Sequence, residues 1–111
     1  MTTIIDVRTG NMLAKHATIT RSAFGHALGL MFSTPRAMVL SFRFPAKRSI
    51  HTWFVFFPLT VLFLDSQQRM VEIATLNPFS VYIPKKEAQH IVELPGRVSG
   101  CRLGSRVRFK C

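Results

Sequence analysis

The hydrophobic and polar positions of this chain are organised around one apolar stretch, Ile50–Asp65. The stretch holds the only tryptophan and four of the ten phenylalanines. Its Val, Ile, Phe, Trp and Thr residues suit the pleated surface of a β-sheet. Pro58 interrupts it, because proline has no N–H to donate and biases the preceding residue toward extended backbone. The pattern therefore predicts two strands, Ile50–Phe57 and Leu59–Asp65, both covered on their two faces.

A transmembrane helix is the alternative interpretation of this stretch. A membrane-spanning helix needs about 20 consecutive apolar residues. The uncharged run is shorter and carries Pro58 in its middle. The strand interpretation is therefore favoured, and no membrane span is expected.

Shorter alternating segments predict further strands on either side. Thr9-Gly10-Asn11 is a turn signal that makes the first two strands a hairpin, and Asn77-Pro78 is another turn. The segment Val98–Leu103 is ambiguous. The other predicted strands are Thr2–Val7, Met12–Thr18, Ala37–Phe44, Met70–Leu76, Phe79–Ile83, Ala88–Leu94 and Ser105–Phe109.

One segment changes period. Apolar residues there recur at i, i+3, i+4 and i+7, which predicts a helix near Arg21–Met31 with Thr20 as a candidate N-cap. The residues of this stripe are Phe24, Ala27, Leu28 and Met31. The fold class predicted for residues 1–111 is mainly β, a single sandwich or barrel-like domain of about nine short strands with one short helix.

The charge balance changes the functional picture. Fifteen Lys and Arg residues stand against five Asp and Glu, which gives a net charge of +10. Such a charge attracts a polyanion such as RNA or DNA, although a merely solvated basic surface is the plainer explanation. One continuous basic patch would favour binding. The candidate nucleic-acid-binding residues are Arg43, Lys47, Arg48, Lys85, Lys86, Arg102, Arg106 and Arg108.

Motifs for catalysis and metal binding are weak. The sequence has no P-loop and no Gly-x-Ser-x-Gly nucleophile elbow. A metal site built from His16, His51 and Cys101 would lack the tight ligand spacing of zinc sites, and Cys101 as a nucleophile has no local support. An enzyme with a site around His51, Thr60 and Asp65 remains the least favoured hypothesis. We assign no catalytic residue, metal or cofactor from the sequence.

The cysteines and the N-terminus bear on the compartment. Cys101 and Cys111 lie close enough in sequence to close a small loop, but Cys111 is the last residue and terminal residues tend to fray. The first residues, Met1–Asp6, lack the basic start and long apolar stretch of a signal peptide. We therefore expect a cytoplasmic protein with reduced thiols.

Four motifs, taken in order, carry a resemblance to a known family. They are Ala27-x-Gly29-Leu30-Met31-Phe32; Phe56-Phe57-Pro58-Leu59-x-Val61-Leu62-Phe63-Leu64-Asp65 followed by Arg69-x-Val71; Pro84-x-Lys86-x-Ala88-x-x-Ile91-Val92-Glu93-Leu94-Pro95; and Gly104-x-Arg106-Val107. Their order resembles the uncharacterised prokaryotic family called domain of unknown function one-nine-two, over Ala14–Phe109. The resemblance implies a compact β-rich fold with a small helix after an early strand, and it implies no activity.

The chain also departs from the family pattern. Many members have a polar stretch before the proline and an aspartate two residues after it, where this chain has Trp53-Phe54-Val55 and Thr60. A polar site there, if the family uses one, is lost or altered in this chain. The usual glycine of the following hairpin loop is missing too. We expect a small non-enzymatic binding or accessory module, with a basic nucleic-acid-binding β domain as the alternative.

Overall fold

The structure, a computed structural model, describes residues 2–20 and 35–110, which form nine strands and no helix. The mainly β prediction is therefore confirmed. The predicted helix near Arg21–Met31 lies outside the described residues, and Thr20 is the last residue of a strand. Across the described ranges, no helix is long and apolar enough to cross a membrane. The strands are β1 (Thr2–Asp6), β2 (Met12–Thr20), β3 (Met38–Ala46), β4 (Ile50–His51), β5 (Leu59–Leu64), β6 (Met70–Leu76), β7 (Val81–Tyr82), β8 (Ala88–Pro95) and β9 (Val107–Lys110).

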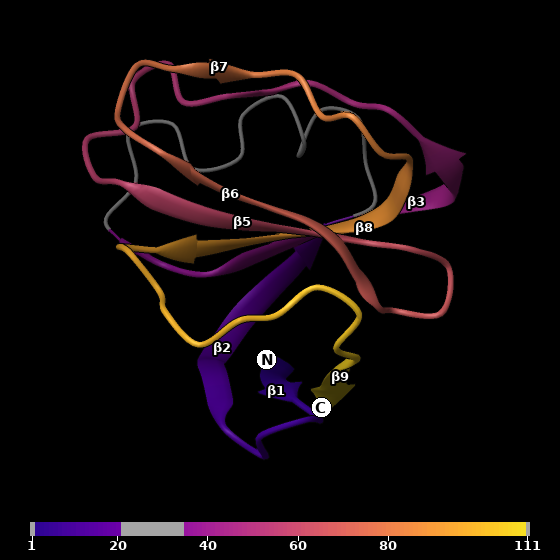
Figure 1. Ribbon diagram of the computed structural model, residues 1–111. Helices are drawn as coiled ribbons and strands as arrows, with labels where there is room; N and C mark the ends of the chain where they lie inside the picture. The colour runs from indigo at the N-terminus through magenta and orange to yellow at the C-terminus, as the bar shows by residue number, and fades with distance from the viewer. Residues whose placement is uncertain (1, 21–34, 111) are drawn as a thin grey trace.

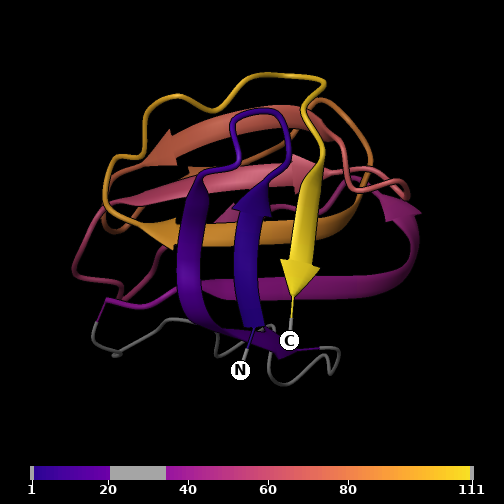
Figure 2. The same cartoon turned by 90° about the horizontal axis from the view of Figure 1, so that it is seen from below.

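Seven strands form one sheet in the order β6-β5-β8-β3-β2-β1-β9, and β4 pairs with β7 in a separate small sheet (Figure 1). The β1–β2 pair is the predicted antiparallel hairpin, whereas β2 and β3 run parallel. The large sheet curls so strongly that β2, β1 and β9 cross β3, β8 and β5 at a steep angle (Figure 2). An isolated bridge between Arg69 and Arg106 joins the two ends of the curl. The sheet is thus nearly closed into a barrel, with β9 next to the start of β6.

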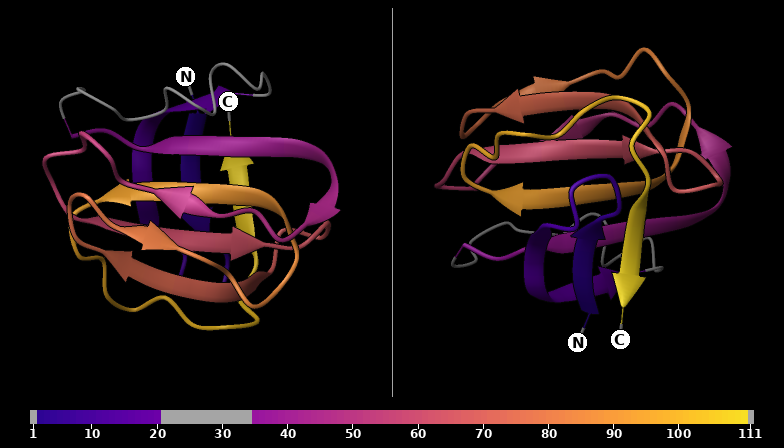
Figure 3. Two further views of the ribbon diagram at one scale, coloured as in Figure 1. Left: turned by 90° about the horizontal axis from the view of Figure 1, so that it is seen from above. Right: turned by 60° about the horizontal axis from the view of Figure 1, so that its bottom comes forward.

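The curl creates two cores, one on each face of the central strands. The inner core fills the curl and includes Ile4, Leu62 and Val107. The outer core lies under the β4–β7 layer, which covers the opposite face (Figure 3), and includes Val61 and Phe63. Successive β5 residues alternate between the two cores, because side chains of a strand point to opposite faces. All six residues of β5 are buried for this reason.

The prediction for the central stretch is right after Pro58 and wrong before it. The expected strand Leu59–Asp65 is β5. The expected strand Ile50–Phe57 is wrong, since only Ile50 and His51 form a strand before the chain turns. Phe54 adopts a positive φ of 57°, which is incompatible with continued extended backbone.

The alternation in β3 was only partly informative. In the sequence, apolar residues at alternate positions of Ala37–Phe44 predict a buried face that includes Phe44 and a solvent-facing side with Ser41 and Arg43. Val39, on the same side as Ser41, is buried in the inner core, and Phe44 is 64% exposed. The first residues of β3 lie between the two cores and are buried, whereas its last residues extend past both cores. Burial therefore changes along each side of the strand.

Candidate functional site

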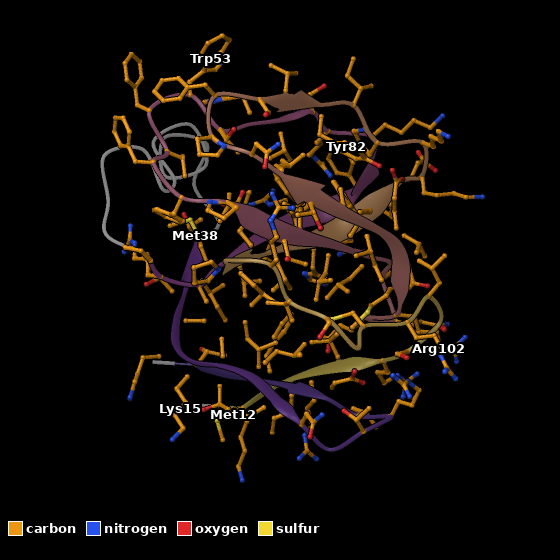
Figure 4. The ribbon with its side chains drawn as sticks, turned by 60° about the vertical axis from the view of Figure 1, so that its left-hand side comes forward. Met12, Lys15, Met38, Trp53, Tyr82 and Arg102 are labelled. Carbon is orange, nitrogen blue, oxygen red and sulfur yellow. The ribbon has the colours of Figure 1, made fainter. Side chains whose placement is uncertain are left out.

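An open pocket of about 400 Å³ lies where the β1–β2 hairpin meets the segment that leads into β9. We call it the arginine pocket. Of the seven described residues that line it, three are arginines and none is acidic. Figure 4 shows Arg102 at the lower right, far from Trp53 at the top of the molecule. The lining residues are Val7, Arg8, Arg102, Leu103, Gly104, Ser105 and Arg106.

Arg8 is held in place by three hydrogen bonds. Its backbone N–H donates to Oδ1 of the buried Asp6 at 3.0 Å. Its side-chain Nε donates to Ser105 Oγ at 3.1 Å, and its Nη2 donates to the Gly100 carbonyl at 2.7 Å. The Arg8 guanidinium therefore joins the hairpin to the C-terminal segment and has a fixed orientation.

Backbone hydrogen bonds fix the opposite wall of the pocket. The Val7 N–H donates to the Arg106 carbonyl at 2.9 Å. Gly104 donates to the Met70 carbonyl and Met70 donates to the Ser105 carbonyl, both at 2.8 Å. Gly104 has a φ of 88°, a left-handed conformation that glycine adopts without strain. The loop that carries Arg102 and Arg106 is thus anchored to β1 and β6.

The Arg102 and Arg106 side chains are exposed, and no described residue forms a hydrogen bond or ion pair with either guanidinium. Two guanidinium groups with free donors beside a fixed third one make a strong anion-binding arrangement. Arg69 faces Arg106 across the bridge, and Arg108 follows two residues later on the same side of β9. This rim of the sheet is therefore strongly positive.

The five acids do little to offset this charge. Asp6 and Glu93 are buried. Asp65 Oδ1 accepts the N–H groups of its own hairpin loop. Glu72 accepts from Tyr82 and from backbone N–H groups near β7. Glu87, in the turn before β8, is the one exposed acid.

The other sequence-predicted basic residues form a second group at the β3–β8 end. It consists of Arg43, Lys47, Arg48, Lys85 and Lys86. The Arg48 guanidinium lies 3.7 Å from the centre of the Phe42 ring and donates to the Ala88 and Phe44 carbonyls at 3.1 Å. Burial lowers the pKa of Arg48. Arg48 therefore holds β3 against β8, and fewer of its guanidinium N–H donors remain for a ligand.

Lys85 and Lys86 are positioned by Glu72. Their backbone N–H groups both donate to Glu72 Oε1 at 2.9 Å, and the Tyr82 hydroxyl donates to Oε2. Burial raises the pKa of Glu72, but these hydrogen bonds outweigh it and leave the pKa lowered. The hydrogen bond to Glu72, followed by burial, raises the pKa of Tyr82 to about 12. The contacts fix the turn, and the two lysine side chains remain exposed.

The hypothetical enzyme site around His51, Thr60 and Asp65 is not assembled. His51 lies on β4, where Nδ1 accepts the Trp53 N–H at 3.3 Å. Thr60 is buried in β5; its hydroxyl donates to the Gly96 carbonyl and accepts the Val98 N–H. Asp65 follows the other end of β5, about 16 Å away along an extended strand. The three side chains serve separate structural roles.

The hypothetical metal and thiol sites gain no support from the geometry. In residues 2–20 and 35–110, no three His, Cys, Asp or Glu side chains converge as metal ligands. Burial raises the pKa of Cys101, and nearby Asp6 adds to this, while Arg8 opposes it. The thiol is thus less ionised than an ordinary one, which disfavours nucleophilic chemistry. Cys111 lies outside the described residues, so the proposed loop closure is not tested.

Glu93 is an ionisable group placed within the outer core. On β8 it pairs with Met38 of β3 and Val61 of β5, both members of that core. The residue is 7% exposed, and burial raises the pKa of its carboxyl to about 7. A carboxyl in this position is costly to ionise and influences stability at neutral pH.

Comparisons with known proteins agree on a family and a fold. The family model described as DUF192, uncharacterized ACR, matches residues 5–109. A UPF0127 protein from Pyrococcus horikoshii is 41% identical over 80 residues, which is 69% of this chain and 70% of that protein. A solved structure of a protein of unknown function from Novosphingobium aromaticivorans has a TM-score of 0.82 at 19% identity, covering 96% of this chain and 82% of that chain.

A second solved structure has the same architecture. It is a Sinorhizobium meliloti protein described as a candidate transcription regulator, with a TM-score of 0.77 at 18% identity. The match covers 97% of this chain and 91% of that chain. At these identities both structures show a shared fold and nothing about activity.

Proposed function

The chain belongs to the DUF192 family of uncharacterised proteins, and from that premise we propose that it is a non-enzymatic β-rich module that binds the phosphate backbone of nucleic acid. The arginine pocket is the observation that carries this proposal. Arg8, Arg102 and Arg106 surround one depression, and none of its lining residues is acidic.

The chemistry of the pocket suits phosphate. A guanidinium presents its donors in a planar fork that matches two phosphate oxygens, and such charge-assisted bonds are strong. Arg8 already uses Nε and Nη2 within the protein, so it mainly supplies charge. Arg102 and Arg106 supply the free donors. Contacts of this kind position a nucleic acid without reading its sequence.

The rest of the molecule is compatible with this role. A net charge of +10 speeds the approach of a polyanion. We include a cytoplasmic location in the proposal, because RNA and DNA are accessible there. The description of the Sinorhizobium meliloti neighbour points in the same direction, but it concerns that protein.

The test is binding of labelled single- and double-stranded RNA and DNA, titrated from low to physiological salt. We expect binding that persists at physiological salt and prefers one nucleic acid. The double variant Arg102→Ala/Arg106→Ala should reduce the slope of log K against log salt by roughly 1.4 to 1.8, because each lost phosphate contact removes about 0.7 to 0.9.

A matched control removes the same charge elsewhere. Lys85→Ala/Lys86→Ala takes two exposed cations from the second basic group and keeps the backbone bonds to Glu72. We expect it to change the slope little. Equal losses in both double variants, or binding that disappears at physiological salt, would show that net charge rather than the arginine pocket attracts the polyanion.

A further inference from the structure

Four aromatic side chains protrude together at the end of the molecule opposite the arginine pocket. Trp53, Phe54, Phe56 and Phe79 are 49%, 44%, 62% and 45% exposed. The Phe79 ring meets the other three edge to face, with centroids 6.4 Å, 5.8 Å and 5.4 Å away in that order. Figure 4 shows Trp53 at this end of the structure. We call these four residues the aromatic tip.

The backbone beneath the tip is firmly held by Thr52, which is completely buried. Its hydroxyl accepts the Ser80 N–H at 2.6 Å and donates to the Asn77 carbonyl at 2.8 Å. Its carbonyl accepts the N–H groups of Val55 at 3.1 Å and Phe79 at 2.9 Å. One residue thus joins the two turns that carry the four rings.

Two of the tip residues have strained backbone. Phe54 has a φ of 57° and Phe79 a φ of 58°, a region that bulky residues seldom adopt. Strained residues that persist in a fold tend to cluster at functional sites. Both rings nevertheless remain well exposed, by 44% for Phe54 and 45% for Phe79. Contact with an apolar surface would remove this exposed apolar area from water.

We propose that the aromatic tip inserts into the interface of a bilayer that contains anionic phospholipids. Tryptophan and other large apolar side chains are favoured at the headgroup level of membranes. The tip segments 52–57 and 77–81 contain no charged residue. At the base of the tip, Arg97 Nη2 donates to Asn77 Oδ1 at 2.8 Å, which places a cation where anionic headgroups would lie. The net charge of +10 attracts the protein to such a surface.

A lipid surface fits these observations better than a second copy of the chain. Self-association through the tip would bring together two molecules that each carry a charge of +10. An anionic bilayer instead complements that charge and accepts a convex apolar group without needing a shaped pocket. The proposal concerns residues separate from those of the arginine pocket, so it stands apart from nucleic-acid binding.

The sole tryptophan makes the test direct, because Trp53 lies in the tip and its fluorescence reports its surroundings. Protein is titrated with vesicles of phosphatidylcholine alone or of phosphatidylcholine with phosphatidylglycerol. We expect a blue shift and protection from acrylamide quenching with the anionic vesicles. Vesicle cosedimentation without a tryptophan shift would overturn the proposal, because charge alone would then hold the protein.

Variants separate the tip from the rest of the surface. Phe56→Ser and Phe79→Asn keep Trp53 and should each weaken vesicle partitioning roughly tenfold, since each removes one inserted ring. Asparagine tolerates the left-handed backbone of Phe79, and Phe56 does not have it, so at least one variant should fold normally. Phe44→Ser is the matched control, because Phe44 is 64% exposed outside the tip. It should partition like the parent.

Other outcomes would assign the tip to another partner. A tryptophan shift that grows with protein concentration in the absence of vesicles would mean that the tip joins two copies. A shift with an acidic protein but with neither kind of vesicle would mean a protein partner. Equal weakening by Phe44→Ser would mean that general hydrophobicity drives adsorption. Each of these results would overturn the lipid assignment.

Discussion

The two halves of the central apolar stretch have similar compositions and opposite environments. After Pro58, every residue of Leu59–Leu64 is at most 1% exposed. Before it, Trp53 and Phe56 are 49% and 62% exposed. The difference lies in the neighbours, because β5 is paired on both edges, by β6 and β8, and lies between two cores. Apolar content alone does not bury a segment unless other strands cover it.

The exposed half is nevertheless anchored through alternate residues. Val55 and Phe57 are 3% and 9% exposed and belong to the outer core. Phe54 and Phe56 alternate with them and are 44% and 62% exposed. Buried and exposed residues therefore alternate along 54–57, and the two exposed ones belong to the aromatic tip.

The largest expected contrast is between two phenylalanines, one from each half. Phe63→Ala should destabilise the protein by about 3 to 5 kcal/mol, because it empties a fully buried site. Phe56→Ala should cost less, about 0.5 to 1.5 kcal/mol, because the exposed ring mainly loses its edge-to-face contact with Phe79. Urea unfolding followed by circular dichroism measures both. Similar losses in the two variants would show that Phe56 is covered in solution.

The buried carboxyl of Glu93 should make the folding stability of the buried region depend on pH. Its pKa is raised to about 7, so the folded state is most stable when Glu93 is protonated. Stability from this group is present below the ordinary pKa near 4.5 and is lost as pH rises through about 7. The shift corresponds to about 3 kcal/mol. Glu93→Gln should match the parent near pH 5 and exceed its stability at pH 8.

The same Glu93→Gln variant should leave the aromatic tip unaffected. Glu93 lies on β8 between its strand partners Met38 and Val61, and none of the four tip residues pairs with it. Denaturant midpoints compared at the two pH values give the stability difference, and vesicle partitioning gives the tip readout. A parallel pH dependence in the variant would mean that Glu93 is not the titrating group.

Local pattern was sufficient to predict three strands of the large sheet. β5, β6 and β8 lie within one residue of the predicted ranges at each end, because apolar runs and turn residues mark them. Residues 50–57 have the same kind of pattern. Their backbone conformation, however, depends on the hydrogen bonds between Thr52 and both Asn77 and Ser80, which lie 25 and 28 residues away in sequence. No local signal carries that information.

The arginine pocket was predictable only in part, for the same reason. Arg102 and Arg106 were candidates because basic residues are dense near the C-terminus. Arg8 was missed, since it joins the pocket through Ser105, which is 97 residues away in sequence. The sequence also did not show that Arg48 would be used in holding β3 to β8.

Two buried threonines provide a closer comparison of the halves. Thr60 in β5 and Thr52 beneath the tip each donate one hydroxyl bond and accept a backbone N–H. Thr60→Val and Thr52→Val should each cost about 1 to 3 kcal/mol, because buried partners are left unsatisfied. Thr→Ser at either position keeps the hydroxyl and is the control. A negligible cost at Thr52 alone would mean that the tip backbone is not fixed in the way the hydrogen bonds indicate.

The smallest expected effect concerns the turns that flank β5. Gln68, in the hairpin loop after it, has a φ of 63°, much like Phe54 before it. Gln68→Gly should raise stability by about 0.5 to 1 kcal/mol, because glycine removes the left-handed strain and loses only part of this in chain entropy. Phe54→Gly relieves similar strain but also removes the ring contact with Phe79, so its gain should be smaller and its vesicle partitioning weaker. Melting temperatures of the two variants measure the difference. A larger gain at Phe54 than at Gln68 would mean that the aromatic tip itself destabilises the free protein. Such a cost is expected of a surface that is retained for a partner rather than for the stability of the fold.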